Sequence, residues 1–184
     1  MANYARPKID KIYIAVFAIA VFFSWILHEF AHWTAGEYLG YKMGITLNSS
    51  YPISGHYTSD LHYQIISAAG PALTLCEATL FYALMRHKNR VVLYPFLFTC
   101  FYMRLFATII SFRNPNDEAR ISSAIGIGKL TLPLIMTTIL FTLIYETTRD
   151  YNFDLKFNLA SLGLTILFSS IIILVDMYLN VRLL

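Results

Sequence analysis

Charged side chains are scarce in this chain. Only 14% of its 184 residues are Asp, Glu, Lys or Arg, whereas 57% are hydrophobic and 16% are aromatic. Soluble globular domains carry about 25% charged residues, so this composition argues against a protein whose whole surface faces water. The net charge of +3 comes from dispersed residues rather than from a Lys/Arg run. Without such a run, we expect no nucleic-acid partner.

Cysteine is also rare. Cys76 and Cys100 are the two cysteines of the sequence, and both lie inside apolar stretches. They show neither the paired spacing of a metal site nor a redox motif. We therefore predict that both are buried as small apolar side chains.

Long apolar runs, by contrast, are abundant. A helix needs about 20 apolar residues to cross a bilayer, where the backbone must satisfy its own hydrogen bonds. Five runs are long enough: Lys11 to Ala35, Tyr63 to Met85, Val91 to Phe112, Ser123 to Tyr145 and Lys156 to Leu179. The first is too long for a signal peptide, so we predict that it is retained. The chain is expected to be an all-α, multi-pass membrane protein with about five transmembrane helices in one domain, residues 1–184, in the plasma membrane.

One connection between these runs is long. Residues 36–62 contain two strand-like pieces, residues 41–47 and 53–58, around a polar turn at residues 48–52. Short β-prone runs separated by turn residues indicate a β-hairpin. We therefore predict a short hairpin-like loop after the first transmembrane helix.

The first apolar run contains the motif His-Glu-Phe-Ala-His, which has the HExxH pattern. Residues four apart lie on one face of a helix, so His28 and His32 can bind one metal ion. Glu29 is next to that face and can act as a general base. A bound zinc ion lowers the pKa of its water from about 16 to about 7, which makes hydrolysis feasible at neutral pH. The alternative is a set of polar residues that hydrogen bond to each other and hold helices together.

A catalytic zinc ion usually has a third protein ligand. The residues that could supply it are His56, Asp60, His62, Glu77, Asp117 and Glu118. The motif lies within about two turns of the end of the first helix, and the third helix leaves the membrane on that same side. Asp117 follows the third helix and begins the fourth at this depth, whereas Glu77 lies roughly 20 Å from that face of the membrane and is expected to be too deep. We predict Asp117 as the third ligand, with Glu118 as its rival.

Two further segments accompany the HExxH motif. Ala68-Ala69-Gly70-Pro71-Ala72-Leu73 is a small-residue element in the second apolar run, and residues 114–121 carry Asp117 two residues after a proline. Together the three segments resemble the site-2 protease family of intramembrane zinc metalloproteases. The resemblance covers about residues 11–130, the expected catalytic core. Where the family has a glycine after the aspartate and a leucine before it, this chain has Glu118 and Asn116.

The resemblance implies a zinc endopeptidase with one zinc ion per chain. Its substrates would be transmembrane or signal-peptide-like segments of membrane proteins, and a regulatory membrane partner would fit the absence of a soluble regulatory domain. The strand at residues 41–47, including Ile45 and Leu47, could bind an unwound substrate along its edge. Asn48 could donate to a substrate carbonyl, or it is an ordinary turn residue.

Other residues have interpretations that need no catalysis. Gly70, Gly126 and Gly128 would allow helices to approach closely. Arg104, inside the third apolar run, is expected to pair with Glu77 or to reach a lipid headgroup.

Two other functions fit the same residues: an inactive relative that binds membrane helices, and a metal-binding membrane protein. The orientation is also open. Eight Lys and Arg residues lie on the side of the N-terminus and five on the other side, which favours a cytoplasmic N-terminus and a site near the outer face. The family resemblance instead implies a site nearer the cytoplasm.

Overall fold

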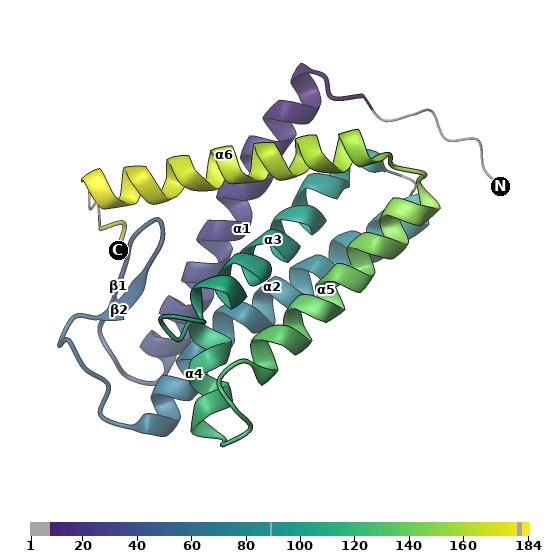
Figure 1. The fold of residues 1–184 in the computed structure, drawn as a ribbon. Coiled ribbons are helices and arrows are strands. Elements are labelled where there is room, and N and C mark those ends of the chain that lie inside the picture. The colour runs from purple at the N-terminus through teal and green to yellow at the C-terminus, as the bar shows by residue number, and fades with distance from the viewer. Residues whose placement is uncertain (1–7, 89, 180–181) are drawn as a thin grey trace.

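The computed structural model describes residues 8–88, 90–179 and 182–184, so Arg6, one residue of the charge count, lies outside the described part. This part contains six α-helices, a short 3₁₀ helix (Val91–Leu93) and a two-stranded sheet (Figure 1). The helices are α1 (Lys11–Tyr38), α2 (Asp60–Lys88), α3 (Tyr94–Ile110), α4 (Asp117–Ala124), α5 (Thr131–Asp150) and α6 (Leu155–Leu179).

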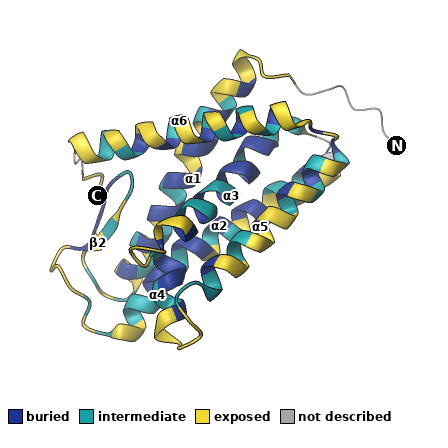
Figure 2. Ribbon diagram, viewed as in Figure 1, coloured by how far each residue is buried: buried dark blue, intermediate teal, exposed yellow. Residues whose placement is uncertain are grey.

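Five of these helices are long and apolar enough to cross a membrane: α1, α2, α3 together with the 3₁₀ turn before it, α5 and α6. The predicted fold class is therefore confirmed, and the chain is a multi-pass membrane protein. Large apolar side chains such as Ile12, Phe22 and Leu80 are more than half exposed. Exposed residues occur along the outward faces of the long helices in Figure 2, as expected where lipid replaces water.

The predicted fourth span was wrong at its start. Residue 123 belongs to the short helix α4, and the membrane helix α5 begins only at Thr131. Gly126 and Gly128 separate the two helices with φ angles of 77° and 93°. Positive φ is readily adopted by glycine and stops a right-handed helix, so these glycines form a turn rather than a close helix contact.

The predicted hairpin is present, but its second strand is shifted. Strand β1 (Met43–Ile45) pairs antiparallel with β2 (Ser50–Pro52), with Gly44 opposite Tyr51. The turn is at residues 47–48, because the Thr46 N–H donates to the Ser49 carbonyl at 2.8 Å and closes it. The strand expected at residues 53–58 is therefore incorrect, because the chain already reverses before residue 50.

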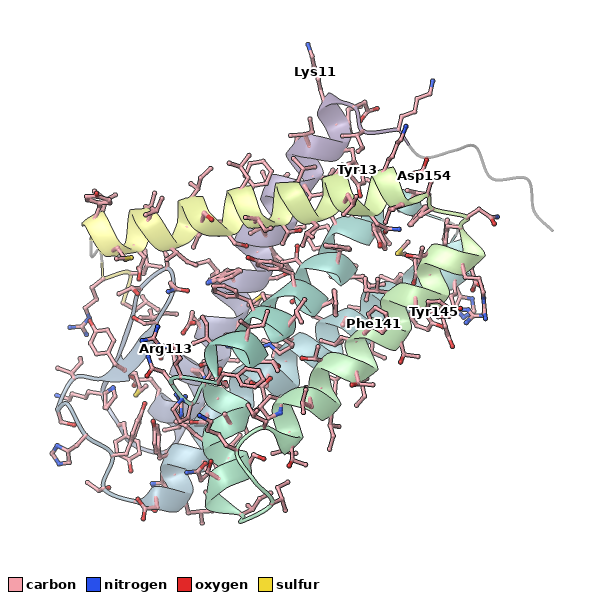
Figure 3. All side chains as sticks on the ribbon, viewed as in Figure 1. Lys11, Tyr13, Arg113, Phe141, Tyr145 and Asp154 are labelled. Carbon is pink, nitrogen blue, oxygen red and sulfur yellow. The ribbon has the colours of Figure 1, made fainter. Side chains whose placement is uncertain are left out.

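Helix α6 runs across α1 rather than alongside it (Figure 1). Near the start of α1, the Tyr13 hydroxyl lies 3.0 Å from Ser161 Oγ of α6, and Lys11 lies beyond α6 (Figure 3). At its other end, the Asp176 carboxylate accepts the Leu47 N–H at 2.9 Å. Helix α6 therefore connects the outer end of α1 to the hairpin loop.

The two cysteines differ in their environment. Cys100 is fully buried in the core of the bundle, as predicted. Cys76 is exposed on α2, so the prediction that it is buried was wrong.

Candidate metal centre

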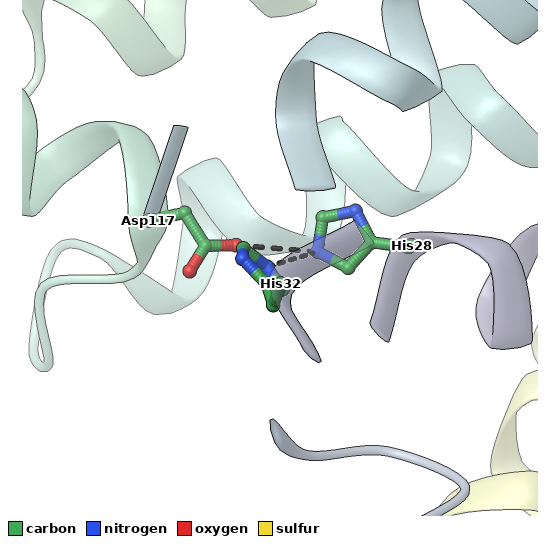
Figure 4. Close-up of side chains that lie close together, drawn as sticks. All are labelled: His28, His32 and Asp117. Atoms are coloured by element: carbon green, nitrogen blue, oxygen red, sulfur yellow. Dashed lines mark hydrogen bonds and ion pairs between the residues drawn. The ribbon is translucent and has the colours of Figure 1, made fainter. Parts of the chain in front are cut away.

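Three buried side chains converge where α1 approaches α4. The Nε2 atoms of His28 and His32 are 3.1 Å apart. Asp117, the first residue of α4, places Oδ2 3.3 Å from His28 Nε2 and 3.4 Å from His32 Nε2 (Figure 4). All three residues are buried, and they form a group that could hold a metal ion.

Both imidazoles are oriented through their other ring nitrogen. His32 Nδ1 lies 2.6 Å from the Ile66 carbonyl oxygen, which can only accept, so this nitrogen carries the proton. His28 Nδ1 lies 3.0 Å from the Thr74 hydroxyl, whose own proton is donated to the Gly70 carbonyl. Thr74 must therefore accept from His28 Nδ1–H. In both rings Nε2 is left with its lone pair directed at the centre, as in metal-binding histidines.

Three acceptors thus face one another without a hydrogen atom between them. Ligands about 2.0 to 2.1 Å from a tetrahedral zinc ion lie about 3.3 to 3.4 Å apart. The observed separations of 3.1, 3.3 and 3.4 Å are close to that edge length. Two imidazole nitrogens and one carboxylate oxygen are also a known ligand set for catalytic zinc.

Asp117 is ready to act as an anionic ligand. Arg120, one turn later in α4, donates from NH2 to Asp117 Oδ1 at 2.5 Å. Arg120 therefore occupies one carboxylate oxygen and leaves the other facing the two histidines.

Glu118 points to a different partner. Its Oε1 accepts from Arg104 NH1 at 3.0 Å, and both side chains are buried. Glu118 is not part of the group of three. The expectation that Arg104 would pair with Glu77 or reach a headgroup was wrong, because the guanidinium lies beside the metal centre and its close carboxylate partner is Glu118.

The remaining candidate ligands lie elsewhere. Glu77 is buried on α2 and accepts a hydrogen bond at 2.5 Å from Ser24, which lies one turn before His28 in α1. Asp60 is exposed at the start of α2, and His56 is exposed in the loop. His62 Nδ1 lies 3.0 Å from the Tyr41 hydroxyl.

A cavity of about 560 Å³ opens in front of the centre. Glu29, which is 8% exposed, lines it together with the three candidate ligands. The turn and second strand of the hairpin form another wall, which includes Asn48. The Asn48 side-chain oxygen accepts from Trp25 Nε1 at 2.7 Å, so its NH₂ group remains as the donor.

The outer edge of β1 is covered by the chain itself. The main-chain N–H and C=O groups of residues 42, 44 and 46 point toward β2. Those of residues 43, 45 and 47 therefore point away from β2, toward the outer edge. The Met43 N–H donates to Glu37 at 2.7 Å, the Ile45 carbonyl accepts from Leu183 N–H at 2.8 Å, and the Leu47 N–H donates to Asp176. Ile45 and Leu47 are therefore on the predicted edge, but the Ile45 carbonyl and the Leu47 N–H already have partners.

Gly70 of α2 provides room for the two imidazoles. A Cβ atom at this position would lie 2.3 Å from His32 Nε2 and 2.5 Å from His28 Cε1. The glycine of the small-residue element therefore contacts the metal centre itself. The sequence signalled a close approach here, but not its partner.

The chain matches no known family model, and comparisons with curated proteins and with solved structures give no significant match.

Proposed function

We propose that this chain is an intramembrane zinc endopeptidase that cleaves transmembrane or signal-peptide-like segments, as in the site-2 protease family it resembles. The observation that carries the proposal is the set of three buried acceptors, His28, His32 and Asp117, facing one another at zinc-like separations. One zinc ion per chain fits this geometry. The centre lies among membrane helices, which supports a substrate that is itself in the membrane. The plasma membrane is the location we propose.

The residues around the centre have distinct roles in this proposal. Zinc would supply Lewis acidity, which makes water nucleophilic near neutral pH. Glu29 takes the proton from the attacking water and passes it to the amine that leaves. Asn48 offers its NH₂ group to a substrate carbonyl across the cavity. A regulatory membrane partner remains part of the proposal, because a substrate must reach a buried site.

Two other functions predict different results. An inactive relative would bind membrane helices without cleaving them. A metal-binding membrane protein would hold zinc but need neither Glu29 nor a substrate cavity. The cavity beside Glu29 favours the endopeptidase.

The test measures zinc and cleavage separately. Purified wild-type protein should hold about one zinc ion per chain and cleave members of a panel of single-helix membrane peptides. Asp117→Ala should lose zinc and activity, because it removes a ligand. Glu118→Gln should keep zinc, because Glu118 faces Arg104. Glu29→Gln should keep zinc and lose about 100-fold or more of the cleavage rate.

The contrary outcomes separate the alternatives. Zinc without cleavage of any peptide would favour the inactive relative or the metal-binding protein. Full zinc in Asp117→Ala would place the third ligand elsewhere. Normal cleavage by Glu29→Gln would refute the hydrolytic mechanism.

A further inference from the structure

Arg104 is a buried cation directly beside the proposed metal centre. It lies in the middle of α3, is 3% exposed and lines the same cavity as Glu29. Its NH1 lies 3.0 Å from Glu118 Oε1 and 3.8 Å from Asp117 Oδ2. A charged group inside a membrane helix is costly unless it is paired or functional. The ion pair with Glu118 accounts for its charge, but it engages only NH1 of the guanidinium.

The guanidinium has five N–H groups. NH1 donates to Glu118, whereas the buried Nε has no acceptor. NH2 is 3.4 Å from His28 Nε2 and 3.5 Å from His28 Nδ1. A point nearly equidistant from the two ring nitrogens does not lie along the lone pair of either.

The protonation of His28 gives a second reason why its ring is a poor acceptor for Arg104 NH2. Its Nδ1–H is donated to Thr74, and its Nε2 lone pair faces the metal centre. Nε of Arg104 therefore has no acceptor among the described residues, and NH2 has only His28 within reach, whose Nε2 lone pair a bound metal ion would occupy. Buried unsatisfied donors at a cavity are expected to receive an acceptor from a ligand.

The position of the charge indicates which ligand atom this is. A guanidinium this close to the centre repels a metal dication. The repulsion is relieved when negative charge develops in the cavity, as it does on the carbonyl oxygen during peptide hydrolysis. Pre-positioned donors aimed at such an oxygen stabilise the transition state more than the ground state.

We infer that Arg104 is a catalytic residue whose unpaired N–H groups stabilise the oxyanion formed from the scissile carbonyl. The inference rests on the proposed function. Water adds to the carbonyl carbon and gives its proton to Glu29, while the C=O π electrons move to the oxygen. The C–N bond then breaks, the carbonyl re-forms, and the amine receives the proton from Glu29. Arg104 keeps all its protons and contributes hydrogen bonds and charge.

The main alternative is that Arg104 only neutralises Glu118. The double variant Arg104→Gln/Glu118→Gln separates the two roles, because it removes both charges and keeps two side chains that can hydrogen bond. If Arg104 only balances charge, this variant has wild-type kcat. The inference instead predicts a kcat at least about 100-fold lower with little change in KM, as for the loss of an oxyanion donor. Arg86→Gln/Glu146→Gln removes an ion pair outside the site, 3.5 Å long, and is the matched control.

A binding measurement gives a readout that does not depend on turnover. A phosphinic peptide carries a tetrahedral anionic group that mimics the oxyanion. By calorimetry, the Arg104→Gln/Glu118→Gln protein should bind it at least tenfold more weakly, with unchanged zinc per chain by elemental analysis. In a structure of wild-type protein with this peptide, the guanidinium should hydrogen bond to a phosphinyl oxygen.

Wild-type kcat and wild-type inhibitor affinity in the double variant would overturn the role of Arg104 and leave the proposed function intact. An inhibitor complex in which Arg104 does not touch the phosphinyl group would do the same, even if the double variant failed to fold. A wild-type protein without zinc or without cleavage would overturn both proposals.

Discussion

At the scale of single residues, the metal centre depends on a position that has no side chain. Gly70 faces the two imidazoles, and a Cβ there would lie 2.3 Å from His32 Nε2. Real Cβ atoms do not approach so closely, and the neighbouring ring is fixed by its bond to Ile66. We therefore predict that Gly70→Ala displaces a ligand and weakens zinc binding by about 10- to 100-fold, as other changes around metal ligands do. Zinc titration of the purified, metal-stripped variant measures this.

The matched control is Gly163→Ala in α6. A Cβ at this position meets no atom within 4 Å, and alanine is the better helix former. Its zinc affinity should equal that of the wild type. Equal zinc affinity in Gly70→Ala would show that the imidazoles do not occupy the positions described above.

Some residues of the metal centre could be predicted from the sequence pattern, and the contacts of others could not. His28 and His32 follow from helical periodicity alone, and Asp117 follows from the depth at which the helices end. The contacts of Arg104 and Arg120 do not follow, because they depend on how α3 and α4 are rotated about their axes. That rotation is set by packing between helices, which one sequence does not reveal.

At the scale of elements, the outer edge of β1 is closed by the chain's own C-terminal residues and α6. Leu183 donates its main-chain N–H to the Ile45 carbonyl, the kind of bond that a paired substrate strand would make. We predict that Leu183→Pro, which lacks this donor, increases the cleavage rate of membrane peptides up to about fivefold. The fivefold upper limit on the rate increase corresponds to the net strength of one hydrogen bond, about 1 kcal/mol. Initial rates at low substrate concentration measure this.

Leu183→Ala is the control, because it shortens the side chain and keeps the N–H donor. It should cleave at the wild-type rate. A faster rate in both variants would assign the effect to the leucine side chain. An unchanged rate in Leu183→Pro would mean that substrates do not compete for this edge.

The element boundaries that the sequence misplaced have local causes. The fourth span was extended too far because Gly126 and Gly128 were interpreted as close-packing residues, whereas their positive φ angles break the helix. The second strand was placed too late because residues 48–52 were all assigned to the turn. In the structure, two residues suffice, and Ser50 already pairs with Ile45. Turn length depends on backbone angles that composition alone does not specify.

At the scale of the whole molecule, five long helices place the hairpin and the metal centre toward one end of the bundle. The first, third and fifth crossings of the membrane are α1, α3 and α6. They are followed by the hairpin loop, the α4–α5 connection and residues 182–184, respectively, so these three segments lie on one side. The turns after α2 and α5 follow the even-numbered crossings. An odd number of crossings also puts residues 182–184 on the opposite side from the start of α1. The charge count and the family resemblance disagree only about which side is cytoplasmic.

This topology predicts which residues a membrane-impermeant maleimide can reach from one side. In a Cys76→Ser/Cys100→Ser background, Ser54→Cys in the hairpin loop and Ile127→Cys before α5 should label from the same side. His87→Cys, after α2, should label only when the membrane is permeabilised or from the other side. Labelling of Ser54→Cys and His87→Cys from one side would contradict the five crossings. The same experiment in intact cells decides the orientation, because the hairpin loop that carries Ser54 covers the metal centre. Labelling of Ser54→Cys would support a site near the outer face, as the Lys and Arg count favours. Protection of Ser54→Cys would support a site nearer the cytoplasm, as the resemblance implies.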